Sequence, residues 1–423
     1  MENISTLVGV LFVLVYALLS RRLDRWWITM PMTMIVLGFL VGPSGFGLIT
    51  VDLRSELVRS VAELTLALML FHDAVRIDLA ALKTGYRIPL RLLGIGLPVM
   101  IVLGTAVAYG MMPSLGLVGA ALLATMLAPT DAALGEAVVS DERLPVSIRQ
   151  GLNVESGLND GLSVPIFLVL LALAADPSAA HTGALVTEMG RQIGFGILGG
   201  ALIGGLGGLL FRFSGAHTML DSWRRIAVLV IAVGCFVCAA VLGGSGFIGA
   251  FVGGVLFGLA SEARSNADNG LTGNLGTVFD AASFLLVGVM LLPFALHYLG
   301  LREVIYVVVS LVVLRLVSVL AAMLGTGARW PTLAFMGWFG PRGLATVVFS
   351  VMLLDQNVAV GNVVASTAIL CVVLSAFAHG LSAPPLVGAY SSWWNKRASS
   401  DAEAIEAEKV AVHAPRGLGA AHE

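Results

Sequence analysis

Charged residues are scarce in this sequence. Asp, Glu, Lys and Arg make up 12% of its 423 residues, whereas 58% are hydrophobic, and the mean hydropathy is +0.94. Soluble globular domains carry about 25% charged residues, so the composition excludes a soluble domain and indicates a membrane protein. The net charge of −2 gives no indication of a nucleic-acid partner, and we expect none.

Cysteine is equally scarce. Cys235, Cys238 and Cys371 all fall in apolar segments. Cys235 and Cys238 have the C-x-x-C spacing of a metal site, but the sequence has no second pair, which favours a packing role. We therefore expect no cofactor. Residues 1–20 lack the basic start of a signal peptide and are interpreted as a membrane span.

Long apolar runs are what the sequence has in abundance. Runs that can cross about 30 Å of hydrocarbon predict an all-α polytopic membrane protein with about 13 transmembrane helices. The eighth and ninth runs meet at "GGSG", so twelve is an alternative count. The predicted spans are 4–20, 28–49, 56–74, 87–112, 115–138, 147–175, 184–211, 222–242, 245–262, 272–297, 301–325, 331–355 and 360–388.

The distribution of positive charge predicts the orientation. Fourteen Arg and Lys residues fall in odd-numbered loops and four in even-numbered loops. Because basic loops stay in the cytoplasm, we expect the N-terminus outside and the C-terminus in the cytoplasm of a multi-pass protein of a cell inner membrane or plasma membrane. The transmembrane domain is predicted to cover residues 1–388, and 389–423 are expected to form a short disordered tail.

The fifth and twelfth predicted spans are interrupted at comparable points. The fifth reads "LLATMLAPTDAALGEA" and the twelfth "FMGWFGPRGLATVVF". Proline removes a backbone donor and clashes with the preceding turn, so each helix should break. The breaks are seven spans apart, and this odd offset is what inverted repeats require. We predict two inverted six-helix repeats, about 1–175 and 222–388, a linking helix at 184–211, and broken helices that cross near the midplane.

The sixth predicted span is unusually polar. Its stretch "NVESGLNDGLSVPIF" places Glu155, Ser156, Asn159 and Asp160 in a segment that should lie in lipid, where ionisable residues indicate function. Residues four apart share a helix face, so Ser156 stacks on Asp160. Thr130, Asp160 and Arg342 all fall near the midplane, counting about 1.5 Å per residue.

These residues suggest a cation site. Alkali cations prefer oxygen ligands, as other hard cations do, and Asp160, Ser156 and backbone near Thr130 could supply them. We expect Asp131 beside the helix ends exposed by the breaks, and count it among the candidate ion-binding residues. Glu155 is the best candidate partner for Arg342. Arg315 also lies inside a span, and Asp280 and Glu63 are candidate partners for it.

The ordered motifs resemble a known family. "APTDA", "VESGLND" and "GPRG" on the fifth, sixth and twelfth spans, with "GGSGFIGAFVGGVLFG" and "HGLSAPPL", are similar to those of the monovalent cation/proton antiporters. The Asn-Asp pair resembles the electroneutral sodium/proton exchanger branch. The resemblance covers about residues 5 to 388 and implies a homodimeric antiporter active in pH homeostasis, working by elevator-like movement of a core domain.

The resemblance also implies residue roles. Asp160 would bind sodium (or lithium) and the proton in turn, with Ser156 and Thr130 helping to hold the cation. Glu155 and Arg342 would form an ion pair, and Asn159 would link it to the fifth span. One carboxylate that exchanges one proton for one cation would be electroneutral. Its partners would be the cation, the proton, membrane lipid and a second copy of the chain.

Three other readings stay open. The same site could exchange potassium for protons, because the sequence does not measure cavity size. An intramembrane hydrolase with Asp131 and Asp160 as an aspartyl pair is a different class, but it offers no reason for Arg342 at a helix break. A passive cation channel would need an open pore, whereas inverted breaks indicate alternating access.

Overall fold

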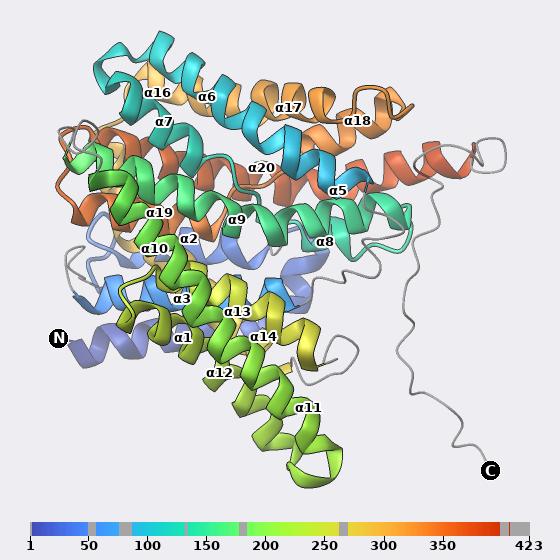
Figure 1. The fold of residues 1–423 in the computed structure, drawn as a ribbon. Coiled ribbons are helices and arrows are strands. Elements are labelled where there is room, and N and C mark those ends of the chain that lie inside the picture. Colours follow the sequence, from blue (N-terminus) through green and yellow to red (C-terminus); the bar gives the residue numbers. More distant parts are fainter. Residues whose placement is uncertain are drawn as a thin grey trace. The chain divides into compact units, whose positions relative to one another are not determined.

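The structure is a computed structural model that describes residues 2–49, 56–75, 87–131, 134–176, 184–261, 270–397 and 406. Within these ranges the secondary structure is entirely helical (Figure 1). The predicted all-α class is therefore confirmed.

By its internal contacts the chain divides into two units. The first unit carries most of the elements, namely α1 (Glu2–Arg25), α2 (Met30–Val41), the start of α3 (Glu56–Val75), α5 (Arg87–Arg91), η1 (Leu92–Gly96), α6 (Leu97–Met111), η2 (Pro113–Leu115), α7 (Gly116–Met126), α8 (Glu136–Val139), α9 (Val146–Ala175), the end of α14 (Gly270–Leu286), η7 (Val287–Leu291), α15 (Leu292–Leu296), α16 (Leu301–Val309), η8 (Ser310–Leu314), α17 (Arg315–Ala322), α18 (Trp330–Trp338), α19 (Leu344–Asp355) and α20 (Gly361–Asn395). The η segments are single π-helical turns, apart from the 3₁₀ turn η2.

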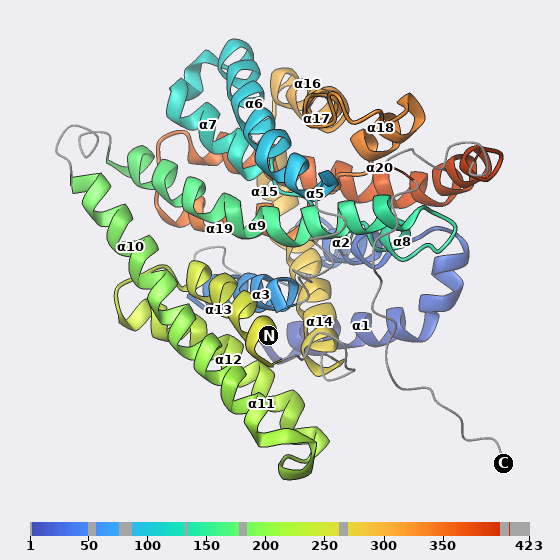
Figure 2. The same cartoon turned by 45° about the vertical axis from the view of Figure 1, so that its right-hand side comes forward.

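The second unit contains the rest of α3 and nearly all of α10 (Ala184–Gly200), with η4 (Ala201–Gly205), α11 (Leu206–Thr218), α12 (Asp221–Val241), α13 (Gly246–Ser261) and the start of α14. The run from α10 through α11 packs along α12 and α13 (Figure 2). Glycines make this packing close, because a side chain at Gly204 would overlap the backbone of Gly253. Small residues play this role between helices in lipid.

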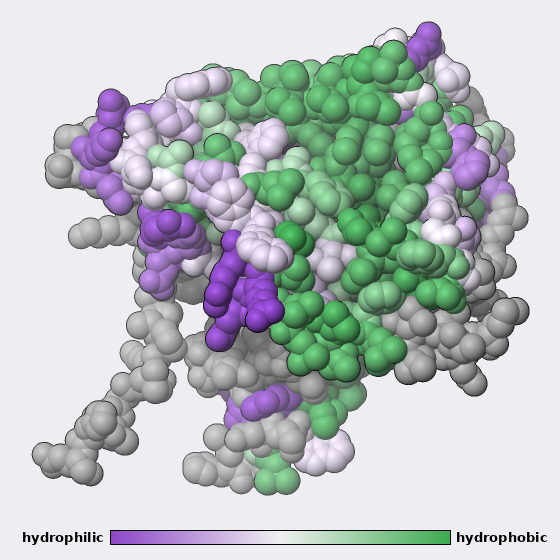
Figure 3. Space-filling model, turned by 180° about the vertical axis from the view of Figure 1, so that it is seen from behind, coloured by the Kyte–Doolittle hydropathy of each residue, from purple (hydrophilic) through white to green (hydrophobic). Residues whose placement is uncertain are grey.

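Several helices have the dimensions of membrane spans. Among the described residues, seven helical segments are long and apolar enough to cross a membrane, and four shorter apolar helices accompany them. Large apolar side chains are exposed on many helices, and hydrophobic residues cover much of the surface seen in Figure 3. Each predicted span contains a helix or a run of helices, although the second, 28–49, is helical only over Met30–Val41. The count of thirteen spans and the inverted repeat remain predictions.

Both predicted breaks are present. Helix α7 ends at Met126, before Pro129, and α8 is the next helix among the described residues. Helix α18 ends at Trp338 and α19 begins at Leu344, so Pro341 lies between two half-helices. The extended segments left by the two breaks meet, since the Asp131 N–H donates to the Pro341 carbonyl at 2.8 Å. The two interrupted segments are therefore in contact, and their crossing near the midplane remains a prediction.

The C-terminal part of the chain differs from the sequence-based boundary. The predicted end of the last span, residue 388, falls inside α20, which continues to Asn395. Most of the predicted tail lies outside the described residues, but Glu406 is buried. Its Oε1 accepts the Arg329 N–H at 3.1 Å and the Thr332 hydroxyl at 2.7 Å. The Ser147 hydroxyl donates to the backbone carbonyl of Glu406 at 2.8 Å. Glu406 therefore joins the starts of α9 and α18.

Close packing of α2 against η7 gives a direct test of the fold of the first unit. A methyl group at Gly288 would overlap the backbone carbonyl of Ile35 and crowd Gly38. Overpacking typically costs about 1–3 kcal/mol, so Gly288→Ala should lower the melting temperature of the detergent-solubilised protein. Gly110→Ala, on α6, is the matched control because nothing lies within 4 Å of the added methyl. Equal melting temperatures for the two variants would contradict this packing.

Candidate functional site

The polar strip of the sixth span lies on α9, and it is buried. Glu155 is 3% exposed, Asn159 1% and Asp160 9%. The helix is continuous from Val146 to Ala175 and carries Pro165 in its interior. Its regular geometry places Ser156 one turn before Asp160, as the spacing predicts. The strip therefore faces protein.

Arg342 closes the broken end of α7. Its guanidinium is fully buried, and one nitrogen, Nη1, donates to the backbone carbonyls of Leu127, Ala128 and Pro129, the latter two at 2.6 and 3.1 Å. The last carbonyls of a helix have no partner within it and carry partial negative charge. The buried Arg342 guanidinium therefore supplies hydrogen-bond donors for these carbonyls and positive charge to balance their partial negative charge.

Asp131 caps the N-terminal end of α19 with a negative charge. Its Oδ2 accepts the Leu344 N–H at 2.9 Å, at the first residue of that helix, and its Oδ1 accepts the Leu134 N–H at 3.0 Å. An acidic side chain at a helix start satisfies free N–H groups and complements the helix dipole. The prediction that Asp131 stabilises an exposed helix end is confirmed. Each break thus supplies the charge that caps the half-helix of the other.

The predicted ion pair between Glu155 and Arg342 is wrong. Glu155 pairs with Arg315 of α17, which donates through both terminal nitrogens, with 2.7 Å between Nη2 and Oε2. Arg315 reaches α9 by passing over the second break, where a side chain at Gly340 would overlap its guanidinium. Arg315 and Arg342 both lie inside predicted spans. The sequence gives the position of each residue along its span but not the direction in which its side chain points. The pair joins α9 to α17, in the eleventh predicted span, rather than to the twelfth span as predicted.

Three polar side chains meet between α9 and the first break. The hydroxyls of Thr130 and Ser156 are 2.9 Å apart, and the Asn159 amide donates to the Thr130 hydroxyl at 2.7 Å. Asn159 thus contacts the chain of the fifth predicted span, and its role as a link to an ion pair stays a prediction. The Asn159 Oδ1 atom is buried and accepts no hydrogen bond from the described residues. Hydroxyl, amide and carboxylate oxygens thus collect on one stretch of α9 and the chain beside it.

This set has the chemistry of a small hard cation site. Thr130, Ser156 and the carboxylate of Asp160 one turn further along α9 are oxygen donors of the kind that such cations prefer. The structure brings Thr130, Ser156 and Asn159 together, and it places Asp131 and Arg342 at the helix ends next to them.

Two contacts at the crossing were missed by the sequence reasoning. The Thr346 hydroxyl donates to the Met126 carbonyl at 2.8 Å, which adds a second cap to α7. The Ser375 hydroxyl of α20 accepts the backbone N–H of Arg342 at 2.7 Å. Serine and threonine are common in membrane helices, so only their position in the fold distinguishes these two.

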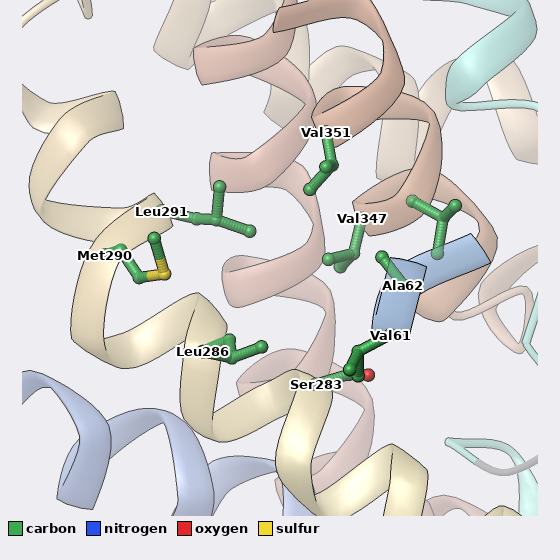
Figure 4. Close-up of a pocket in the computed structure, with 9 residues that line it drawn as sticks. Val61, Ala62, Ser283, Leu286, Met290, Leu291, Val347 and Val351 are labelled. Carbon is green, nitrogen blue, oxygen red and sulfur yellow. The ribbon is translucent and has the colours of Figure 1, made fainter. Parts of the chain in front are cut away.

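The other side of α19 is apolar. A pocket of ≈ 20 Å³ lies there, with Val347 and Val351 facing Leu286 and Met290 (Figure 4). It has room for about one water molecule, and Ser283 supplies the single polar side chain of its lining. A pocket with this lining lacks the set of oxygen ligands that a small hard cation prefers.

Comparisons with known proteins agree on one family. A family model described as sodium/hydrogen exchanger, transmembrane, matches residues 9–389. The K(+)/H(+) antiporter NhaP2 of Shewanella oneidensis is 24% identical over 386 residues, which are 90% of this chain and 66% of that protein. The Na(+)/H(+) antiporter of Schizosaccharomyces pombe is 25% identical over 328 residues, 73% of this chain and 68% of that protein.

The fold is similar to a solved one. The sodium proton antiporter MjNhaP1 from Methanocaldococcus jannaschii superposes with a TM-score of 0.73 at 17% sequence identity, and the match covers 90% of this chain and 99% of that chain. The chain spans just under two thirds, 66%, of the length of the Shewanella relative.

Double-mutant cycles distinguish the two arginines. Removing one member of a buried pair leaves the other uncompensated, at a cost of about 3–5 kcal/mol. Glu155→Gln and Arg315→Gln should each lower the melting temperature in detergent. The double variant should lower it by much less than the sum of the two single decreases. The Glu155→Gln and Arg342→Gln cycle should show a clearly smaller coupling. A larger coupling to Arg342 would restore the original assignment.

Gly343 tests the Asp131 cap. A methyl at this position would overlap the Asp131 carboxylate, so Gly343→Ala must displace the carboxylate from the start of α19. Loss of a cap costs about 0.5–2 kcal/mol, and we expect a melting temperature lowered to match. Asp131→Ala should add little to the loss in Gly343→Ala, because both remove the same contact. Fully additive losses would show that Gly343 acts in another way.

Proposed function

The chain belongs to the sodium/hydrogen exchanger family, and on that premise we propose that it is a secondary transporter that exchanges a monovalent cation for a proton across the membrane. The observation that carries the proposal is the crossing of two broken helices, each capped by a charge from the other, beside an oxygen-rich face of α9. Broken helices at membrane depth are where such transporters bind their ions.

Asp160 is the proposed binding group. It lies one turn beyond Ser156, whose hydroxyl contacts Thr130, so these three residues can contribute oxygens to one dehydrated cation. Asp131 caps α19 and would act on the bound ion through its charge. A carboxylate that holds either a proton or a cation, but not both at once, couples the two fluxes. Competition for Asp160 is thus the proposed core of the exchange.

The proposed stoichiometry is one proton for one cation. Glu155 is neutralised by Arg315, and the charges of Asp131 and Arg342 have opposite sign and lie at helix ends of opposite polarity. Asn159 is neutral. If Asp160 alone exchanges its ion, each cycle moves no net charge. A two-for-one exchanger would gain about 2.3 kcal/mol per 100 mV of membrane potential, and this one should not respond to it.

Two cations are candidates. Sodium, with lithium as its small analogue, is the first candidate, because the family and the Schizosaccharomyces relative are named for sodium. Potassium is the second, because the Shewanella relatives are named K(+)/H(+) antiporters. The same three oxygen-bearing residues would serve either ion.

The proposed setting is a homodimer in a cell inner membrane or plasma membrane, with the N-terminus outside and lipid around its apolar surface. Basic residues concentrated in alternate loops support the orientation. Against the hydrolase reading, both oxygens of Asp131 already accept backbone N–H groups, which leaves Asp131 poorly placed to share a proton with Asp160.

Proton flux in proteoliposomes tests the proposal. A pH-sensitive dye inside the vesicles reports the response to sodium, lithium and potassium added in turn. Wild type should show saturable flux with at least one cation, unaffected by a valinomycin-clamped voltage in the sodium and lithium arms. Asp160→Asn should lose at least about 95% of it, because removing the charge abolishes a binding group.

Asp141→Asn is the matched control. Hydrogen bonds from Arg143 hold the pKa of Asp141 below its usual value, so this variant also removes one negative charge, but in the turn between α8 and α9, where the Asp141 side chain is 18% exposed. It should keep wild-type flux. Full flux in Asp160→Asn would exclude Asp160 as the binding group, and the absence of cation-driven flux in wild type would refute antiport.

A further inference from the structure

The Trp338 carbonyl, at the C-terminal end of α18, accepts the Gly340 N–H at 2.9 Å and has a second lone pair that can accept another hydrogen bond. The C-terminal end of α18, at Trp338, has carbonyls that the helix itself cannot satisfy. His379 of α20 lies against it, 2% exposed, with its Nε2 atom 2.8 Å from the Trp338 carbonyl oxygen. The ring lies next to the aromatic rings of Trp338 and Phe339, with centroids 5.2 and 6.3 Å away. His379 is thus in place to cap α18.

The other ring nitrogen leads to Arg342. Nδ1 of His379 lies 3.1 Å from the Ser375 hydroxyl, which accepts the Arg342 N–H at 2.7 Å. The carbonyl of Ser375 is 2.9 Å from the same nitrogen. Ser375 and His379 are four residues apart and share one face of α20. This face therefore contacts the chain on both sides of the second break.

Counting protons assigns a direction to the chain of hydrogen bonds. The Ser375 hydroxyl accepts from Arg342 and has a single proton to donate, and Nδ1 can accept it if it carries no proton itself. A neutral ring then has its proton on Nε2, where it is donated to Trp338. A proton on Nδ1 would instead be donated to the Ser375 carbonyl, but a neutral ring would then place an unprotonated Nε2 against the Trp338 carbonyl and lose the bond from the Ser375 hydroxyl. A doubly protonated ring would add a second positive charge near Arg342, which is unfavourable.

We propose that His379 is a positioning residue of the transport site: as a neutral ring it accepts from Ser375 and donates to Trp338, and so fixes the backbone of Arg342. The Arg342 side chain caps α7 just before Thr130. Loosening Arg342 would therefore displace an expected cation ligand. This inference rests on the proposed antiport, although the hydrogen-bonded chain itself does not.

The consequence is a specific effect on cation affinity. Loss of one net hydrogen bond corresponds to about a five-fold change in an equilibrium. In proteoliposomes, His379→Leu and Ser375→Ala should each raise the apparent KM for the driving cation about five-fold, with a smaller change in maximal flux. Because both break the same chain, the double variant should resemble either single variant.

Rescue by a conservative side chain separates positioning from packing. His379→Gln can donate to Trp338 with its amide and accept from Ser375 with its oxygen, so its KM should stay within about two-fold of wild type, on the scale of one net hydrogen bond. Ser382→Ala is the matched control, since it removes another bond between α20 and α18, the 2.8 Å bond from the Trp338 indole. Its KM should equal that of wild type.

Several results would overturn the inference. A His379→Gln variant as impaired as His379→Leu, additive KM effects of Ser375→Ala and His379→Leu, or an unchanged KM in both would each do so. If wild type shows no cation-driven flux, the proposed function fails, and the hydrogen-bonded chain is judged by melting temperature in detergent. Non-additive losses of Ser375→Ala and His379→Leu support it there, and additive losses refute it.

Discussion

The crossing of two broken helices depends on an exchange of charge. A helix that stops inside a membrane exposes backbone groups that lipid cannot satisfy. Here Arg342 follows the break after α18 and caps α7, while Asp131 follows the break after α7 and caps α19. Neither side chain could remain buried without the helix end it contacts, and neither helix end could remain buried without the side chain. The two breaks therefore stabilise each other.

The surrounding contacts extend this arrangement. Thr346 adds a hydroxyl to the end of α7, and Ser375 holds the backbone of Arg342. The pair of Glu155 and Arg315 ties α9 to α17 across the second break. The neutral hydroxyls of Thr130 and Ser156 lie next to each other beside these contacts. Glu155 and Arg315 pair with each other, and Asp131 and Arg342 contact helix ends, next to the proposed cation ligands.

Much of this could be predicted from the sequence, for physical reasons. A proline in a helix interior removes a backbone donor and kinks or breaks the helix, and the helices do break near Pro129 and Pro341, whereas α9 continues through Pro165. Helical periodicity placed Ser156 and Asp160 on one face of α9. The pairing of Glu155 failed because depth along a span does not tell which way a side chain points, and Arg315 reaches Glu155 only because Gly340 leaves room for it. Capping by Thr346 and Ser375 likewise depends on contacts between distant segments.

Proton release on cation binding tests the central claim, competition for Asp160, most directly. Purified protein in detergent would be titrated with the transported cation by calorimetry in two buffers of different ionisation enthalpy. At a pH where Asp160 is protonated, we expect binding to release close to one proton per cation, and we expect Asp160→Asn neither to bind the cation nor to release a proton. Cation binding at that pH without proton release would rule out competition for Asp160.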